Sequence, residues 1–355
     1  MRIFRVNDFR MIKTIDDIMQ LVRGNIRSLA PYSTARDEYK GELGAFLDAN
    51  ENPFANGYNR YPDPRQAQLK AQISRIKGMP VENIFVGNGS DEAIDLCMRI
   101  FCEPRVDNVV TIAPTYGMYK VSAAINDVEV REVQLGPDFS LPVQALLDAC
   151  DKNTKLMFLC SPNNPTGNSF PVEQMQWLLE NFGGIVVVDE AYIDFSAQES
   201  MSALLGRYCN LIVLQTLSKA YGLAALRLGL AFAHERVMRI FANVKYPYNI
   251  NLAGMEIAQR LLERGVQGEV DTIIKERGRV AAALATFRCV ERVYPSDANF
   301  LLVKVDDAQT IYNALIEQKV IVRDRSRVAG CEGCLRITIG TPEENDLLLQ
   351  IMSKR

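Results

Sequence analysis

The sequence predicts an α/β protein in which a parallel sheet is covered by helices, followed by a smaller α+β domain. Short apolar runs bounded by turn residues recur between segments with helical spacing. These runs do not alternate between apolar and polar residues, which is typical of strands buried on both faces of a sheet. After about residue 284, two strand-like runs flank one helical segment. That change of pattern predicts a separate, smaller unit.

The elements follow in chain order. A helix is predicted over residues 91–101, where Ile94, Met98 and Phe101 recur at helical spacing. Another is predicted over residues 172–181, because Pro171 suits the start of a helix. Residues 251–284 are rich in helical pattern, and a further helix is expected at 307–318. The predicted strands are residues 108–112, 155–160, 185–188, 211–214 and 228–232 in the large part, and 299–305 and 335–339 in the small part.

These elements divide the chain into three predicted parts. Residues 1–54 form an N-terminal arm and part of the small domain, residues 55–284 form the large domain, and residues 285–355 form the C-terminal small domain. Residues 1–54 are rich in charge and loop signals and contain no strand run. We therefore expect this segment to pack against the C-terminal part.

Composition and charge exclude several classes of protein. The 355 residues include 40 Lys and Arg against 43 Asp and Glu, and 48% are hydrophobic, as in an ordinary globular chain. No basic run could displace the counterions of a phosphate backbone, so nucleic acid is not an expected partner. No apolar stretch is long enough to span a bilayer, and residues 1–10 do not form a secretory signal. We expect a cytoplasmic protein without membrane contact.

The single histidine and the eight cysteines limit the available chemistry. His234 cannot pair with a second histidine at a zinc site, and its position before a predicted helix indicates a capping role. The cysteines are scattered in apolar segments, as expected for reduced, buried thiols. Cys331 and Cys334 have C-x-x-C spacing, but no second pair or histidine lies near them in the sequence. No metal site is predicted.

A Gly-x-Gly-Ser turn at residues 87–90 follows an apolar run and precedes a predicted helix. It lacks the third glycine of a dinucleotide fingerprint and the lysine of a phosphate-binding loop of nucleotide hydrolases. Free backbone N–H groups and the helix dipole can still bind one phosphate there. The alternative is a plain helix cap formed by Ser90 or Asp91.

Polar and aromatic groups also follow the other predicted strands. Asp189 ends the run 185–188, with Tyr192 three residues on, and Asn164 lies in a turn made rigid by prolines and a glycine. Tyr116 lies on a similar loop after 108–112. Because the carboxyl ends of parallel strands meet at one edge of a sheet, these groups are expected to share a ligand-binding crevice. The alternative for Asp189 is a salt-bridged loop acid.

Lys219 follows the strand at 211–214, among small residues, and Arg227 comes eight positions later. A partly desolvated amine near another cation has a lowered pKa and can act as a nucleophile. Taken alone, Lys219 would be interpreted as a surface lysine. The strand-end groups on the same expected edge favour a catalytic interpretation.

Taken in order, these motifs resemble those of the fold-type I pyridoxal-phosphate aminotransferases. They are Gly-Ser-Asp at 89–91, Pro-Thr-Tyr at 114–116, Asn-Pro-Thr-Gly at 164–167, Asp-Glu-Ala-Tyr at 189–192, Ser-Lys at 218–219, and Arg227. More narrowly, the segments at 31–32, 50–53, 60–62, 161–167 and 333–340 resemble the histidinol-phosphate aminotransferase family. The resemblance covers about residues 20–350. It implies a large domain with a mostly parallel seven-stranded sheet, a small α+β domain and the cofactor pyridoxal 5′-phosphate.

The resemblance also implies a role for each residue. Lys219 would carry the cofactor covalently and move a proton, and Asp189 would pair with the pyridine nitrogen. Tyr192 and Asn164 would bond the ring oxygen, and Tyr116 would stack on the ring.

The cofactor phosphate would bind at Gly89, Ser90 and Asp91, with Ser218 and Arg227 adding hydrogen bonds. Tyr61 resembles a tyrosine that reaches the neighbouring subunit's cofactor, which implies a homodimer with shared sites.

For substrate binding, the resemblance points to Arg336, whose guanidinium can bind a carboxylate or a phosphate through two hydrogen bonds. Arg323, Tyr32 and Asn52 are further candidates. The implied reaction is amino transfer between histidinol phosphate and 2-oxoglutarate. A broader aromatic aminotransferase and a threonine-phosphate decarboxylase are alternatives with the same fold. A non-catalytic sensor that binds the cofactor or another ligand is an alternative from a different class.

Overall fold

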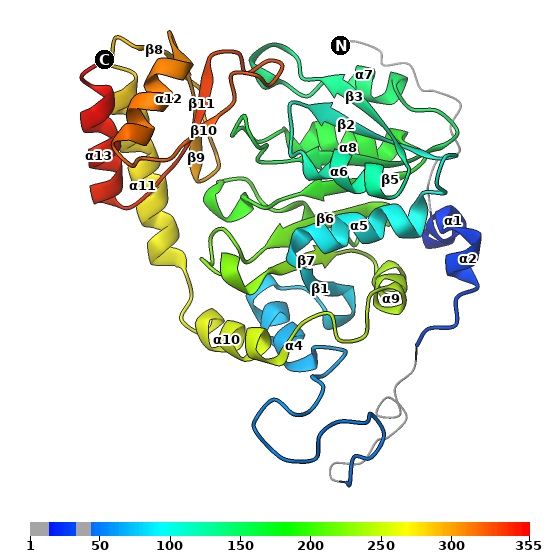
Figure 1. Ribbon diagram of the computed structural model, residues 1–355. Helices are drawn as coiled ribbons and strands as arrows, with labels where there is room; N and C mark the ends of the chain where they lie inside the picture. The colour runs from blue at the N-terminus through cyan, green and yellow to red at the C-terminus, as the bar shows by residue number, and fades with distance from the viewer. Residues whose placement is uncertain (1–13, 33–43) are drawn as a thin grey trace.

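The computed structural model describes residues 14–32 and 44–355. Its main feature is a seven-stranded sheet with the order β1-β7-β6-β5-β4-β2-β3 (Figure 1). The strands are β1 (Ile84–Asn88), β2 (Asn108–Ala113), β3 (Glu129–Gln134), β4 (Thr154–Cys160), β5 (Ile185–Asp189), β6 (Leu211–Thr216) and β7 (Leu228–Phe232). Only β7 runs against its neighbours, β1 and β6. The predicted mostly parallel α/β sheet of seven strands is therefore confirmed.

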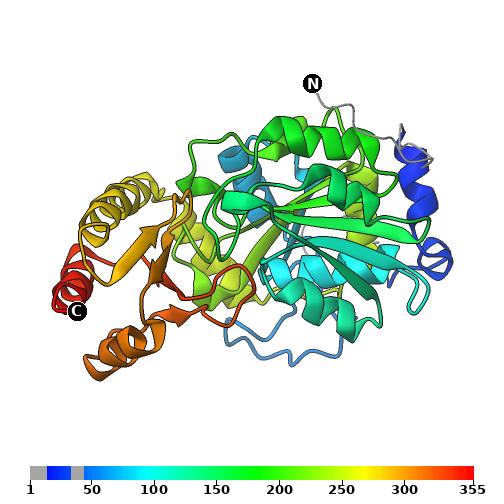
Figure 2. The same cartoon turned by 90° about the horizontal axis from the view of Figure 1, so that it is seen from above.

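Helices cover both faces of this sheet (Figure 2). Alternate residues of β5 show why its sequence is apolar throughout. Ile185 and Val187 pack into the core that includes α5 (Gly89–Phe101) and α9 (Glu235–Val244). Val186 and Val188 pack into the core that includes α4 (Ala67–Lys77) and α8 (Val172–Asn181). Because successive side chains of a strand point to opposite faces, a strand covered on both sides needs apolar residues at every position.

The helices of this domain include α4 (Ala67–Lys77), α5 (Gly89–Phe101), α6 (Met118–Ile125), α7 (Val143–Asp148), α8 (Val172–Asn181), α9 (Glu235–Val244) and α10 (Leu252–Leu262). Short 3₁₀ turns are η1 (Val81–Asn83), η2 (Pro137–Phe139), η3 (Ile193–Phe195), η4 (Met201–Leu204) and η5 (Ala224–Leu226). The helices predicted at 91–101 and 172–181 match α5 and α8. The predicted cap is also confirmed, because the side chain of His234 accepts a hydrogen bond from the backbone N–H of Arg236 at the start of α9.

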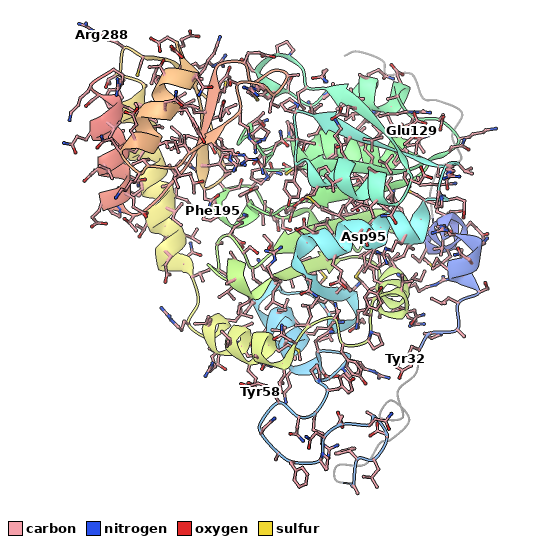
Figure 3. All side chains as sticks on the ribbon, in the orientation of Figure 1. Tyr32, Tyr58, Asp95, Glu129, Phe195 and Arg288 are labelled. Carbon is pink, nitrogen blue, oxygen red and sulfur yellow. The ribbon has the colours of Figure 1, made fainter. Side chains whose placement is uncertain are left out.

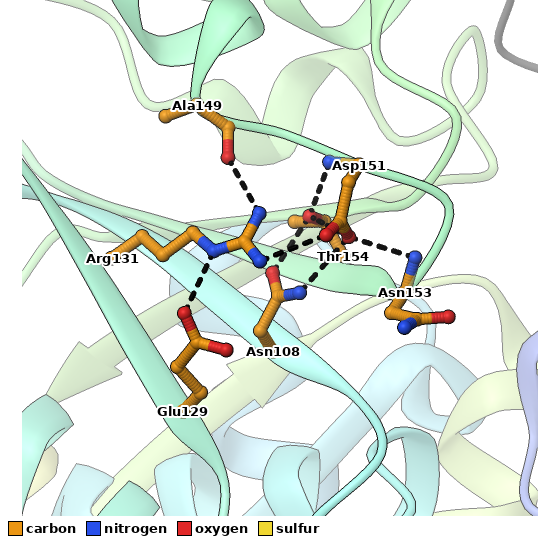
Figure 4. Close-up of polar contacts among 7 residues, drawn as sticks. All are labelled: Asn108, Glu129, Arg131, Ala149, Asp151, Asn153 and Thr154. Carbon is orange, nitrogen blue, oxygen red and sulfur yellow. Dashed lines mark hydrogen bonds and ion pairs between the residues drawn. The ribbon is translucent and has the colours of Figure 1, made fainter.

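Strand β3 has no counterpart among the predicted strands, because its sequence is rich in charge. It lies at the edge of the sheet, where half of its side chains meet solvent. Arg131 on β3 donates to Glu129, to Asp151 and to the backbone oxygen of Ala149, and so ties the strand to the turn before β4 (Figure 4). Burial opposes the charge of Asp151, but hydrogen bonds from Asn108 and Arg131 outweigh it and hold the Asp151 pKa well below its usual range.

The C-terminal part forms a second, antiparallel sheet with the order β10-β11-β9-β8. Its strands are β8 (Val290–Val293), β9 (Phe300–Val305), β10 (Arg323–Asp324) and β11 (Cys334–Thr338). Helices α11 (Gln267–Leu284), α12 (Ala308–Glu317) and α13 (Pro342–Met352) pack on one face. The predicted smaller α+β unit is therefore confirmed, and the uncovered face of its sheet turns toward the large domain.

The N-terminal helices α1 (Ile15–Leu21) and α2 (Gly24–Arg27) lie at the opposite end of the molecule from the small domain (Figures 1 and 2). Ile18 and Val22 are buried in the core beside α5 and α9, and Arg23 pairs with Glu103. The expected packing of this segment against the C-terminal part is therefore wrong for α1 and α2. The apolar residues Ile18 and Val22, which pack these helices against the large domain, stand among charged residues in the sequence, so their burial was not predicted.

Helix α11 bridges the two parts of the chain. Val270 in its first half packs with Tyr192 and Phe195 of the large domain and with Phe300 of β9. Val280 and Leu284 in its second half pack with the small sheet. The predicted division between residues 284 and 285 therefore falls after a helix that already contributes to the small domain's core. The other boundary, between residues 54 and 55, stays a prediction.

Glu190, directly after β5, is a buried carboxyl group whose charge depends on pH. It accepts hydrogen bonds from Ser200 Oγ (2.5 Å), Met201 N (2.6 Å) and Gln215 Nε2 (3.0 Å). Burial raises its pKa from the ordinary 4.5 to about 7. The folded chain therefore keeps this proton at pH values where the unfolded chain has released it. The resulting stabilisation is complete below about pH 4.5 and is lost as the pH rises through about 7.

We expect Glu190→Gln to make stability less dependent on pH. The full effect of Glu190 corresponds to roughly 3 kcal/mol, and a glutamine carries no charge at any pH. Among the described residues, Gln215 Oε1 is buried without a hydrogen-bond partner, and it can accept from the new amide once the Gln215 amide turns over. The check is the free energy of urea unfolding at about pH 5 and about pH 8, with the exposed Glu199→Gln as control. Equal pH dependence in the variant and the wild type would contradict the prediction.

Candidate active site

A cavity of about 550 Å³ lies between the carboxyl ends of the large sheet's strands and the uncovered face of the small sheet. All but three of the predicted site residues line it. They are Gly89, Ser90, Asp91, Tyr116, Asn164, Asp189, Tyr192, Ser218, Lys219, Arg227, Arg323 and Arg336. The topology brings them together, because β2, β4, β5 and β6 are parallel and end at the same edge.

The turn from β1 into α5 forms one end of the cavity. Gly89 has a φ of +69°, which favours glycine, and its N–H donates to the backbone oxygen of Arg227 (2.8 Å). The first amides of α5 have no partner within the helix. Asp91 accepts hydrogen bonds from Tyr116 Oη (3.0 Å) and Arg227 Nη2 (3.4 Å). A helix start beside a guanidinium can bind an anion.

Gly229 on β7 allows this turn to approach the sheet. It pairs with Gly87 of β1, and a Cβ at Gly229 would overlap the backbone of Gly89 and Ser90. We expect Gly229→Ala to push the turn away and to lower the free energy of unfolding by roughly 1–3 kcal/mol. Urea unfolding measures this loss, with Gly206→Ala as control, because a Cβ at Gly206 meets no atom within 4 Å. Equal stability of the two variants would contradict the overlap.

Asp189 ends β5 at the floor of the cavity and is only 2% exposed. Tyr119 Oη donates to its Oδ2 (2.8 Å), and the N–H of Ala191 donates to its Oδ1 (3.1 Å). Burial raises its pKa to about 6, although these hydrogen bonds favour the charged form. This carboxyl group is thus fixed in orientation and ready to pair with a cationic ligand atom.

Lys219 lies within the turn that follows β6. Burial lowers its pKa, and the nearby cations Arg336 and Arg227 lower it further. Its Nζ lies 5.9 Å from the ring centre of Tyr192. A lysine in this setting is more readily neutral than a surface lysine, so its amine can act as a nucleophile or a base.

Asn164 links the two sheets across the cavity. Its Nδ2 donates to Tyr192 Oη (3.3 Å), and its Oδ1 accepts from Arg336 Nη1 (2.5 Å). The buried Asn163 supports this loop, because its amide bonds the backbone oxygen of Pro114 and the hydroxyl of Thr166. The loops that carry Tyr116 and Asn164 are therefore held together below the cavity.

Three predicted site residues do not line the cavity of this chain. Tyr32 and Asn52 are exposed on the N-terminal segment, and Figure 3 shows Tyr32 away from both sheets. Tyr61 is 50% exposed and stacks on Tyr248 with ring centres 4.4 Å apart. Their roles come from the family resemblance, which assigns Tyr61 to the neighbouring subunit's cofactor, and they stay predictions.

Two contributors were missed in the sequence. Tyr119 looks like an ordinary apolar position of α6, yet its hydroxyl reaches Asp189. Arg325 lines the cavity with Arg323, two residues before it. The period of two between these arginines is the signal that could have identified Arg325, because residues i and i+2 of a strand share a face.

The other sequence features lie apart from this chemistry. Cys331 and Cys334 are buried free thiols, and burial raises their pKa values to about 12 and about 11. Among the residues the structure describes, no group of three or more His, Cys, Asp or Glu side chains could hold a metal ion. Within the same part of the chain, no helix is both long and apolar enough to cross a membrane.

Comparison with known proteins gives the class first. Residues 39–352 match the family model for class I and II aminotransferases, so the chain belongs to that family and is an aminotransferase. The protein named histidinol-phosphate aminotransferase from Parabacteroides distasonis is 53% identical over 95% of this chain and 98% of its own length. The protein of the same name from Flavobacterium johnsoniae is 50% identical over 94% and 97%. Within the class, this chain belongs to the histidinol-phosphate aminotransferases.

Solved structures agree with the fold. The histidinol-phosphate aminotransferase from Clostridium acetobutylicum has a TM-score of 0.75 at 22% identity, covering 83% of this chain and 90% of that one. The enzyme of that name from Sinorhizobium meliloti, in complex with pyridoxal 5′-phosphate, has a TM-score of 0.73 at 25% identity, covering 83% and 82%. Dependence on pyridoxal phosphate is characteristic of the family.

Proposed function

We propose that this enzyme transfers an amino group reversibly between L-histidinol phosphate and 2-oxoglutarate, forming imidazole acetol phosphate and glutamate in histidine biosynthesis. The observation that carries this proposal is the 53% identity, over nearly the whole chain, to a protein named for this activity. The charges of the cavity agree with it. Five basic side chains and two carboxyl groups line the cavity, which suits ligands that carry phosphate.

The residues of the cavity fit pyridoxal phosphate as the cofactor. A Cβ at Gly89 would approach Arg227 Nη2 to 2.7 Å, so glycine keeps this end open for a phosphate. Ser90, Ser218 and Arg227 would hold the phosphate, and Asp91 would hold Arg227. When bound, pyridoxal phosphate supplies an electron sink for the charge left when a proton leaves the substrate's α-carbon.

Lys219 would hold the cofactor and move this proton as general base and acid. Its lowered pKa increases the fraction of neutral amine that can accept a proton near neutral pH. Lys219 lines the cavity with Tyr192, Asp91 and Asp189, and its Nζ lies 5.9 Å from the ring centre of Tyr192.

Asp189 would accept the N–H of the pyridine ring and keep that nitrogen charged. Tyr119 orients the carboxylate for this contact. Tyr192 and Asn164, already joined by a hydrogen bond, would hold the ring oxygen, and Tyr116 would lie against the ring face.

Arg336 and Arg323 would bind the anionic end of each substrate from the small domain. Asn164 already orients Arg336. Since histidinol phosphate has a phosphate and glutamate has carboxylates, the same guanidinium would serve both halves of the reaction.

The working unit would be a homodimer in the cytoplasm. Leu47 and Phe54, on the segment before α4, are 89% and 81% exposed, which is a large apolar surface for a single chain. A second copy would cover it. Tyr61 would then reach the partner's cofactor phosphate, and Tyr32 and Asn52 would complete the partner's substrate site.

The test combines a spectrum with turnover. The purified enzyme, loaded with pyridoxal phosphate, is expected to be yellow and to lose that colour when histidinol phosphate is added. 2-Oxoglutarate should restore the colour and complete the cycle. Phenylalanine, tyrosine and threonine phosphate serve as comparison substrates.

Each outcome separates the alternatives. Loss of colour with histidinol phosphate and sustained turnover with 2-oxoglutarate support the proposal. Equal turnover of aromatic amino acids favours the broader aromatic aminotransferase, and release of carbon dioxide from threonine phosphate favours the decarboxylase. Binding of the cofactor without any turnover favours the sensor.

A further inference from the structure

We propose that Arg325 binds the phosphate of the substrate and selects phosphorylated over unphosphorylated amino donors. This inference rests on the proposed function and adds a specificity-determining residue to it. The roles proposed above for the cofactor do not involve Arg325, whose Nε is buried without a hydrogen-bond partner among the described residues.

Strand pairing places three guanidinium groups on one face of the small sheet. Arg323 of β10 lies directly opposite Arg336 of β11, so their side chains share a face. Arg325 comes directly after β10, two residues beyond Arg323, and its N–H donates to the backbone oxygen of Cys334 (2.9 Å), two residues before Arg336. With a side-chain period of two, Arg325 joins the same face, and all three arginines line the cavity.

These arginines have donors to spare. Among the described residues, Arg325 Nε and Arg336 Nε are buried without a hydrogen-bond partner. In the same part of the chain, neither side chain forms an ion pair with a carboxylate. Asp324 lies between two of the arginines in sequence, but it accepts instead from the N–H and hydroxyl of Ser326. A buried donor without a partner lowers the free energy of unfolding. The side of the cavity lined by the three arginines is therefore suited to a ligand that supplies hydrogen-bond acceptors.

Charge gives the acceptor's class. Burial lowers the pKa of Arg325, and the neighbouring Arg336 and Arg323 lower it further, which places the three cations close enough to repel one another. At the opposite end of the cavity, Arg227 is balanced by Asp91. A phosphate monoester, with up to two negative charges and three terminal oxygens, would relieve the repulsion and accept the free donors.

The loop that carries Arg325 is anchored. Val328 and Cys331, which follow it, pack with Phe139 of the large domain and Tyr294 of the small domain. The backbone that carries Arg325 is therefore held in place before the substrate arrives, also through the hydrogen bond from its N–H to Cys334.

The experiment compares Arg325→Gln with Arg327→Gln in the loaded enzyme. Arg327 is an exposed arginine on the same loop that does not line the cavity. The readout is the ratio of kcat/KM for histidinol phosphate to kcat/KM for histidinol, with the glutamate half-reaction measured alongside. Inhibition by inorganic phosphate, competitive with histidinol phosphate, gives a second readout of the same site.

We expect Arg325→Gln to lower this ratio roughly 10- to 100-fold, mainly through KM, since one charge-assisted contact is lost. Its inhibition constant for inorganic phosphate should rise by a similar factor. The glutamate half-reaction should change by less than about threefold, and Arg327→Gln should behave as wild type. Arg325→Lys keeps the charge but loses the two parallel donors of the guanidinium, so its ratio should lie between those of Arg325→Gln and the wild type. It also replaces Arg325→Gln in the test if that variant fails to fold.

Two results would overturn the inference. One is an unchanged ratio in both Arg325 variants, and the other is an equal loss with histidinol phosphate, histidinol and glutamate, which indicates a structural role. A wild-type enzyme that does not turn over histidinol phosphate would instead refute the proposed function. The two failures are therefore distinguishable.

Discussion

Lys219→Ala is expected to abolish amino transfer while leaving the fold and the cofactor site in place. The methyl group cannot accept or return a proton, so we expect kcat to fall roughly 10⁴-fold or more, the upper range for a general base. The cofactor should still bind, although not covalently, because Arg227 and Asp189 do not depend on Lys219 for their own contacts.

Single-turnover kinetics with histidinol phosphate measure this loss, and dialysis followed by absorbance shows whether the cofactor remains. The exposed Lys275→Ala on α11 is the matched control and should keep wild-type activity. Appreciable turnover by Lys219→Ala would assign the proton transfer to another group. Loss of the cofactor together with activity would leave Lys219 a role in binding only.

Asp189→Asn is expected to give the second largest loss of activity. An amide fills the same space and can keep both contacts, accepting from the N–H of Ala191 and donating to the hydroxyl of Tyr119, but it has no charge to keep the pyridine nitrogen protonated. Removing one preorganised electrostatic contact of this kind costs roughly 10²- to 10³-fold in kcat. The free energy of unfolding should not fall, because the variant removes a buried carboxyl group whose charge is opposed by burial.

Tyr119→Phe tests how the carboxylate is positioned. It removes one hydrogen bond to Asp189 but keeps the charge, and we expect a loss of only about 3- to 10-fold. The order of the two effects is the result that matters. Wild-type activity in Asp189→Asn, or a larger loss in Tyr119→Phe, would contradict the assigned role of the charge.

The buried strands of the large sheet could be predicted because burial on both faces permits almost only apolar residues. β2, β4, β5, β6 and β7 are covered on both faces, so each is apolar at nearly every position. The edge strand β3 and the short strands β8 and β10 escaped prediction, because solvent on one side permits charged residues. The direction of β7 also escaped, since an apolar run does not show which way a buried strand runs.

The sequence by itself determined the fold class and the groups at the strand ends, because turns rich in glycine and proline mark where each buried strand stops. Only the tertiary structure placed Tyr119 against Asp189 and Arg325 beside Arg336, since both contacts join residues far apart in sequence or on different strands. Only the tertiary structure showed that α1 and α2 pack against the large domain and that α11 contributes to the small domain's core. Local sequence indicates whether a residue is buried, exposed or in a turn. The contact partner of a buried side chain depends instead on which distant element packs against it.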